Sequence, residues 1–220
     1  QGNIIMLVDN MPSAIILPTT FFEQLSQIEE YTQTPIVSFF TRIIRYLGVF
    51  MSIYLLPFII VCMLSPHSFL QLPFENRNIG FIAFQVLICE LLIEWIRQSF
   101  LYAPNLINSM MGFLVVFVLG DFGIEMGAYI KEILLLVALS NLGNFLTPSY
   151  EVALANKIMR IMLTMFSLAF QVSGFCIGLL IHFLLLLTTR TFKLPYLYPL
   201  FPFDIKELKR MIFDTNIYTK

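Results

Sequence analysis

The chain has 220 residues, of which 58% are hydrophobic and 12% are charged, with a formal net charge of −1 at pH 7. Globular domains carry about 25% charged residues, so a soluble fold of this length could not bury so much apolar surface, and we predict an all-α integral membrane protein. The small net charge excludes the basic face that nucleic-acid binding requires.

Residues 1–40 are too polar to span a bilayer and are predicted to form a cytoplasmic elbow beside the membrane, at the end of a soluble domain that precedes it. The β-type runs Ile4–Val8 and Ala14–Leu17 flank a turn sequence and predict a hairpin. Thr20 and Glu23 form a capping-box pattern that starts a short helix, expected to end near residue 30.

Residues 41–188 are predicted to form the transmembrane domain. Five apolar segments follow one another there: Tyr46–Leu64, Gly80–Phe100, Ile107–Leu119, Ile130–Leu146 and Ile158–Leu187. The helix that contains the first of them is expected to start at Pro35, because proline is favoured at the first helical position. The last segment would be about 45 Å long as one helix, which exceeds a hydrocarbon core of about 30 Å, so it must tilt, protrude or bend.

Lysine and arginine residues occur at both ends of this domain. Arg42 and Arg45 precede the first span, and further cations follow the last one, namely Arg190, Lys193, Lys206, Lys209 and Arg210. The positive-inside rule then places both ends in the cytoplasm, which requires an even number of crossings. We therefore predict about four transmembrane helices plus one re-entrant or interfacial helix. Gly80–Phe100 and Ile107–Leu119 are the weakest spans, and a re-entrant segment would indicate an aqueous cavity.

Residues 189–220 are predicted to form a cytoplasmic tail at the membrane interface. The stretch Leu194–Phe203 is rich in aromatic residues and proline, a composition that suits the headgroup layer. Asp204 with Glu207 can cap a short amphipathic helix that continues to Phe213.

An acidic pair inside an apolar segment is the main candidate for function. Glu90 and Glu94 lie one helical turn apart and so point to the same side, and Arg97 is within reach of Glu94. A charge at the bilayer centre costs about 2.5–3.5 kcal/mol on insertion scales. Three interpretations remain open, namely an ion-paired structural face, a cation-attracting ring in an oligomeric pore and a proton relay. We predict that Glu90 and Glu94 line a polar path, with Arg97 as a tether.

Other polar and small residues in the apolar segments are secondary candidates. Gln171 is a candidate path or interface residue, although interhelical hydrogen bonding explains it equally. The motifs Gly123–Gly127 and Gly174–Gly178 have GxxxG spacing and predict close helix packing, within one subunit or between subunits.

The sequence contains no pattern typical of catalysis or of a bound cofactor. Cys62, Cys89 and Cys176 lie in apolar runs without a CxxC pair, and His67 and His182 are isolated. No catalytic residue, metal ligand or cofactor is predicted, and we expect the protein not to be an enzyme.

Several stretches resemble the membrane domain of the spore germinant receptor A-subunit (GerA-type) family. They are Leu7–Ser13, Leu17–Phe22, Thr147–Glu151, Leu154–Lys157 with Arg160, and Pro195–Phe203. Their order and spacing extend over nearly all 220 residues.

The resemblance implies a multi-pass protein of the bacterial inner spore membrane, with a cytoplasmic domain upstream. It also implies a homo-oligomer in contact with lipid and with other germination membrane proteins. The expected function is an oligomeric ion channel or a signal relay during germination, and the alternative is a non-conducting scaffold that stabilises receptor complexes. A secondary transporter is disfavoured because the segments show no internal repeat.

Overall fold

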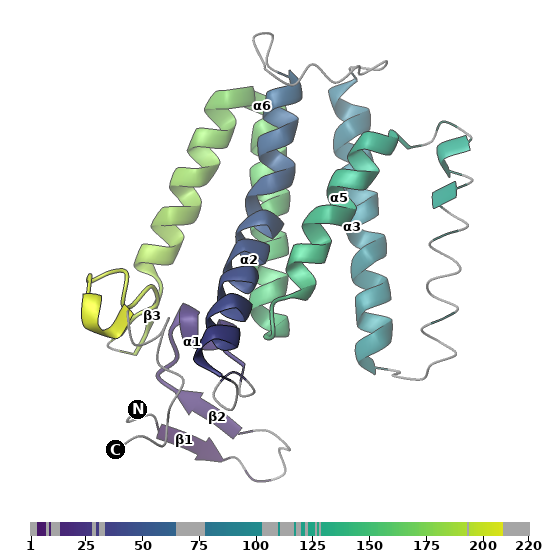
Figure 1. Cartoon of the computed structure of the whole chain (residues 1–220). Coiled ribbons are helices and arrows are strands. Elements are labelled where there is room, and N and C mark those ends of the chain that lie inside the picture. Colours follow the sequence, from purple (N-terminus) through teal and green to yellow (C-terminus); the bar gives the residue numbers. More distant parts are fainter. Residues whose placement is uncertain are drawn as a thin grey trace.

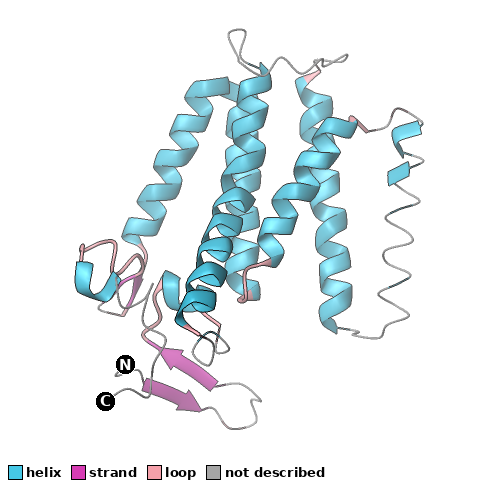
Figure 2. Ribbon diagram, viewed as in Figure 1, coloured by secondary structure: helices cyan, strands magenta, loops and turns pink. Residues whose placement is uncertain are grey.

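Long helices run side by side in the computed structural model, and two small antiparallel sheets lie at one end of them (Figures 1 and 2). The structure describes residues 4–7, 9, 14–27, 30, 34–64, 78–102, 110, 117, 120, 121, 123–125, 127, 129–192 and 194–208. The helices are α1 (Phe21–Leu25), α2 (Pro35–Leu64), α3 (Ile79–Tyr102), α5 (Lys131–Phe145) and α6 (Tyr150–Thr188). The strands are β1 (Ile4–Leu7), β2 (Ala14–Leu17), β3 (Arg190–Thr191) and β4 (Leu194–Pro195).

The elbow contains the local structures that its sequence predicts. β1 and β2 pair antiparallel with Ile4 opposite Leu17, which confirms the hairpin. Thr20 caps α1, and the Glu23 side chain accepts a hydrogen bond of 2.9 Å from the Thr20 amide, which confirms the capping box. α1 ends at Leu25, earlier than expected, because the backbone is already extended at the next residue.

A buried ionic cluster fixes the elbow to the start of α2. Glu30 is 2% exposed, accepts a hydrogen bond of 2.9 Å from Arg42 Nε, and pairs with Arg45. Arg45 also donates to the Leu25 carbonyl oxygen over 2.6 Å. The two arginines that were used to predict the orientation are therefore internal ion-pair partners, and the cytoplasmic location of this end stays a prediction.

Three helices are long and apolar enough to cross a membrane, namely Ile36–Leu64, Ile79–Gln98 and Tyr150–Thr188. The predicted number of about four spans is thus not confirmed in the described part of the chain. α3 qualifies as a span in spite of its charged residues. Most of the predicted segment Ile107–Leu119 lies outside the described residues, and α5, with 15 residues, is shorter than the about 20 that a perpendicular span needs.

α6 reverses direction at Gln171, where the backbone has φ 55° and ψ −130°. Two arms, residues 150–170 and 172–188, meet at the upper end in Figure 1 and run back along one another. Their contacts agree with this arrangement, because Ser52 and Tyr54, two positions apart in α2, bond to Arg160 in the first arm and to His182 in the second. Of the three predicted alternatives, a tilt, a protrusion or a bend, the structure has the bend, and it takes the form of a hairpin.

The two arms of α6 approach each other at Gly174 and Gly178. A Cβ atom on Gly174 would collide with the carbonyl oxygen of Phe166, and one on Gly178 would lie 3.3 Å from Leu163 Cγ. Close backbone contact of this kind is what GxxxG spacing allows. This motif therefore packs two helical arms of the same chain.

The other GxxxG motif, Gly123–Gly127, does not pack two helices within the described part of this chain, and packing between subunits stays a prediction. Gly123 lies against the ring of Tyr129, whereas Gly127 follows a short helical segment and has φ +68°. A left-handed residue just after a helix ends it, and glycine adopts that conformation without a Cβ clash. Gly123 and Gly127 have GxxxG spacing, but Gly127 ends a helix instead of lying on the face of one.

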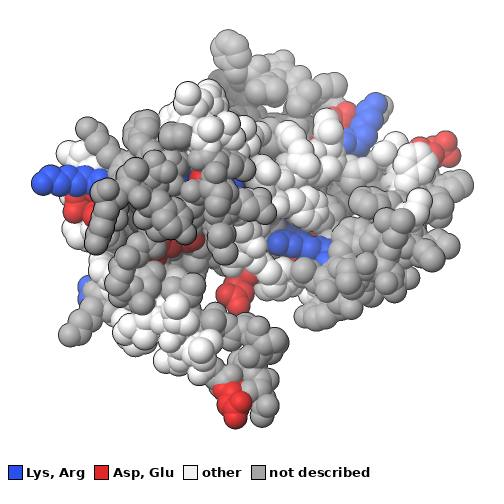
Figure 3. Space-filling view, turned by 60° about the horizontal axis from the view of Figure 1, so that its bottom comes forward, with Lys and Arg blue, Asp and Glu red and all other residues white. Residues whose placement is uncertain are grey.

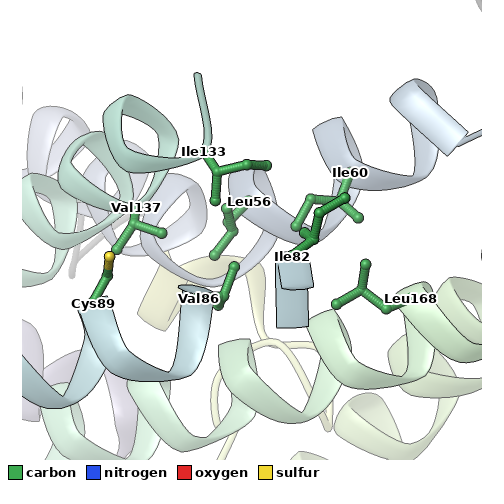
Figure 4. Close-up of a cluster of buried hydrophobic side chains, with 8 residues drawn as sticks. All are labelled: Leu56, Ile60, Ile82, Val86, Cys89, Ile133, Val137 and Leu168. Atoms are coloured by element: carbon green, nitrogen blue, oxygen red, sulfur yellow. The ribbon is translucent and has the colours of Figure 1, made fainter. Parts of the chain in front are cut away.

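The apolar core lies where α2, α3, α5 and the first arm of α6 meet (Figure 4). Its members are Leu56, Ile60, Ile82, Val86, Cys89, Ile133, Val137 and Leu168. α2 and α5 cross at Gly48 and Gly143, where a Cβ on Gly143 would collide with the Gly48 carbonyl oxygen. The crossing brings the polar residues of α5 close to α2 and so shapes the site described below.

Substitution of Gly174 tests the hairpin. Gly174→Ala should lower the free energy of unfolding by about 1–3 kcal/mol, because the added methyl group collides with a backbone atom. Gly120→Ala is the matched control, since no atom of the described residues lies within 4 Å of its added Cβ. Unfolding of both variants in detergent micelles measures the difference, and equal stability would contradict the packing of the two arms.

Candidate functional site

Glu90 lies at the centre of a buried polar network. It is 1% exposed on α3, and its Oε2 atom accepts hydrogen bonds from Arg160 (2.7 Å) and from the Asn141 amide (3.2 Å). Arg160 also donates to Asn141 Oδ1 over 2.9 Å and to the Ser52 carbonyl oxygen over 2.7 Å. The network therefore links α2, α3, α5 and α6 through one carboxylate and one guanidinium group.

Glu94, one turn further along α3, has a cation of its own. Lys157 Nζ lies 2.6 Å from Glu94 Oε2 and 3.7 Å from Glu90 Oε2. The Tyr150 hydroxyl donates to Glu94 Oε1 over 3.0 Å. The two carboxylates thus face Lys157 and Arg160, and the formal charges of the four groups cancel. Pairing of this kind is what permits charges in a medium of low dielectric constant.

Arg97 does not have the role that its position in the sequence predicts. Its guanidinium group lies 5.0 Å from the centre of the Tyr150 ring and 6.0 Å from that of Phe145. Within the described residues it forms no ion pair with Glu94, whose bound cation is Lys157. Lys157 is therefore the cation in direct contact with Glu94, because the facing helix α6 brings that amine to the carboxylate, and Arg97 acts on Glu94 only through its charge at a longer distance.

Gln171 is not part of this network. It is exposed at the reversal of α6, about 16 Å along the first arm from Arg160 at 1.5 Å per residue. The structure thus brings Glu90 and Glu94 together, as predicted, and separates Gln171 from them.

Lys157, Arg160 and Asn141 were missed as site residues by sequence reasoning. The missed signal is that two helices carry complementary pairs of charges. Glu90 and Glu94 lie one turn apart in α3, and Lys157 and Arg160 lie three residues apart in α6 and so share a face of that helix. Sequence spacing pairs residues only within one helix, whereas these partners lie 63 and 70 positions from the glutamates.

The arrangement holds charges inside the protein. On one face of the molecule the described acidic and basic side chains form a few small groups, and in some of these red and blue atoms lie next to each other (Figure 3). Across the described ranges, no group of three or more His, Cys, Asp or Glu residues is placed to hold a metal ion. What the network does chemically is to fix helices by charge-assisted hydrogen bonds, which are stronger than neutral ones.

The whole chain, residues 1–220, matches the family profile described as Bacillus/Clostridium GerA spore germination protein. It is 34% identical to stage V sporulation protein AF of Bacillus subtilis strain 168, over 98% of this chain and 44% of that protein. The run Ser149–Lys157 predicts this particular similarity, and the match confirms it.

Two further relatives are named as spore germination proteins. The chain is 24% identical to spore germination protein KA of Bacillus subtilis strain 168, over 97% of this chain and 40% of that protein. It is 27% identical to spore germination protein GerQA of Bacillus cereus, over 92% of this chain and 42% of that protein. The chain thus spans less than half the length of these curated relatives. No solved structure matches it.

Lys157→Met and Arg97→Met should differ in their effects on stability. Loss of Lys157 leaves Glu94 without its bound cation, which costs about 3–5 kcal/mol for a fully buried pair, and somewhat less here because Glu94 is 12% exposed. Loss of Arg97 removes an aromatic contact of about 1 kcal/mol. Unfolding in detergent measures both variants, and Glu94→Gln should recover part of the stability lost in Lys157→Met but not in Arg97→Met. A larger loss for Arg97→Met would restore Arg97 as the tether.

Proposed function

The chain belongs to the GerA family of spore germination proteins, and from this premise we propose that it is a membrane subunit of a germination complex in the inner spore membrane. In that complex it relays the germination signal across the membrane as part of a homo-oligomer, together with lipid and other germination membrane proteins. Support comes from the match over all 220 residues and from three helices that are apolar enough to cross a membrane.

The ion-paired network favours signal relay over conduction through a path lined by Glu90 and Glu94. Acidic residues that select cations in a channel form rings of charge around the pore, whereas the charge of Glu90 is paired with that of Arg160 inside the protein. A network that joins α2, α3, α5 and α6 passes a displacement of one helix to the others. This is the observation on which the relay proposal rests. Ion conduction, if an oligomer performs it, then uses a surface other than these carboxylates.

A non-conducting scaffold is the second candidate function. It is supported by the cancellation of charge among Glu90, Glu94, Lys157 and Arg160, which leaves a rigid and neutral interior. A scaffold requires a stable bundle and outer faces that other membrane proteins can contact, and it requires no polar path. Either role is non-enzymatic, in line with the lack of a catalytic sequence motif.

Reconstitution separates these functions. The full-length protein, in liposomes with its partner proteins, is tested for flux of monovalent cations. In the relay or scaffold role, Glu90→Gln should reduce the amount of assembled complex, because Arg160 loses its counter-charge, and flux per assembled complex should not change. Glu151→Gln is the control, because this exposed carboxylate belongs to the same bundle but lies outside the network.

Two outcomes would contradict the proposal. A change in ion selectivity for Glu90→Gln, with assembly at the level of Glu151→Gln, would identify Glu90 as a pore residue. Normal signalling by spores in which the complex fails to assemble would exclude both the relay and the scaffold. If the unaltered protein conducts monovalent cations only while the germination signal is present, a gated relay is favoured over a scaffold.

A further inference from the structure

A group of buried polar side chains around Glu90 lacks hydrogen-bond partners. Within the described residues, the atoms without a partner include Glu90 Oε1, Ser140 Oγ, Asn144 Oδ1, Thr147 Oγ1, Asn156 Nδ2 and Arg160 Nε. Each of these residues is at most 6% exposed. A buried polar atom without a partner carries the full cost of its lost hydration, and proteins satisfy nearly all such atoms. So many in one region indicate a polar occupant.

Three of these residues form a stripe along α5 and the turn that follows it. Ser140 and Asn144 are spaced i, i+4 and so lie on one side of α5, and Thr147 lies in the turn just beyond the end of this helix at Phe145. Gly143 lies on the same side and against the backbone of α2, since a Cβ there would lie 3.3 Å from Ser52 N. The polar stripe of α5 therefore faces α2 inside the bundle.

The remaining residues lie at the same level of the bundle. Asn141 of α5 bonds to Arg160 of α6, and the loop 146–149 joins the two helices. Asn144 is one turn from Asn141 toward this loop, and Asn156 is one turn from Arg160 toward the same loop. The unpartnered atoms thus extend over about two helical turns, from Glu90 to Thr147. The exposed Pro148 follows directly.

The chemistry of these atoms points to water as the occupant. Glu90, Ser140, Asn144 and Thr147 offer oxygen acceptors, whereas Asn156 and Arg160 offer N–H donors. A cation would be repelled by these donors, and it would find no surplus negative charge, because the ion pairs cancel. Water donates and accepts, and buried waters typically make about three hydrogen bonds to such groups.

We propose that these six residues line a hydrated polar pocket, which opens at the loop 146–149 and brings water from that end of the bundle to Glu90. The pocket exists whether the complex relays a signal or serves as a scaffold. In the relay role it has a mechanical use. Glu90 Oε2 lies 2.7 Å from Arg160 and 3.7 Å from Lys157, and neighbouring water lowers the cost of shifting the carboxylate between the two cations.

Cysteine labelling tests the pocket directly. In full-length protein in membrane vesicles, with Cys62, Cys89 and Cys176 replaced by alanine, Asn144→Cys and Thr147→Cys are exposed to a small water-soluble methanethiosulfonate. The control is Leu142→Cys, on the outer face of α5, where the leucine is 61% exposed and is expected to lie against lipid. Both pocket thiols should react at least about tenfold faster than the control, because only a hydrated thiol ionises to the reactive thiolate. Equal or slower reaction would overturn the pocket.

A milder substitution gives an independent answer if the cysteine variants do not fold. Thr147→Val keeps the side-chain shape and removes the hydroxyl group. If water satisfies that hydroxyl, the melting temperature falls below that of Thr188→Val, which alters an exposed hydroxyl at the end of α6. If the hydroxyl is dry and unsatisfied, its removal raises the melting temperature. A rise, or a value equal to the control, would overturn the proposal.

Discussion

The ion pair between Glu90 and Arg160 is the contact on which the arrangement of the bundle depends. Neither side chain is more than 1% exposed, so each charge is tolerable only with the other in place. Arg160 extends the pair by donating to Asn141 and to the Ser52 carbonyl oxygen. Because these acceptors belong to α5 and α2, one guanidinium group determines the positions of the helices around it. Apolar contacts have no fixed direction, so by themselves they constrain the relative positions of the helices less than these hydrogen bonds do.

The thickness of the bilayer is a second constraint, and it accounts for the reversal of α6. Gln171 has a positive φ that side chains rarely adopt, at a cost of about 1–3 kcal/mol. A straight helix would carry the apolar second arm out of the hydrocarbon core, which is far more costly. The hairpin is therefore stabilised by the membrane and by the close contact of Gly174 with the first arm.

Signals that act within a few residues were interpreted correctly from the sequence. The capping box of Thr20 and Glu23, the helix start at Pro35 and the hairpin of β1 and β2 are all confirmed. Each of these depends on hydrogen bonds or steric limits between near neighbours. GxxxG spacing was less informative, since within the described part of this chain it correctly indicated helix packing at Gly174 but not at Gly123.

The sequence by itself determined that this is a helical membrane protein and that Glu90 and Glu94 need compensation, because an apolar segment cannot hold two bare charges. The tertiary structure decided which cations neutralise the two carboxylates. Arg97 is near in sequence, yet Lys157 and Arg160 are the partners. The reason is geometric, because a side chain on the same helix competes poorly with cations that a facing helix directs at the carboxylates. Only the folded chain also brings Asn141 of α5 to Glu90.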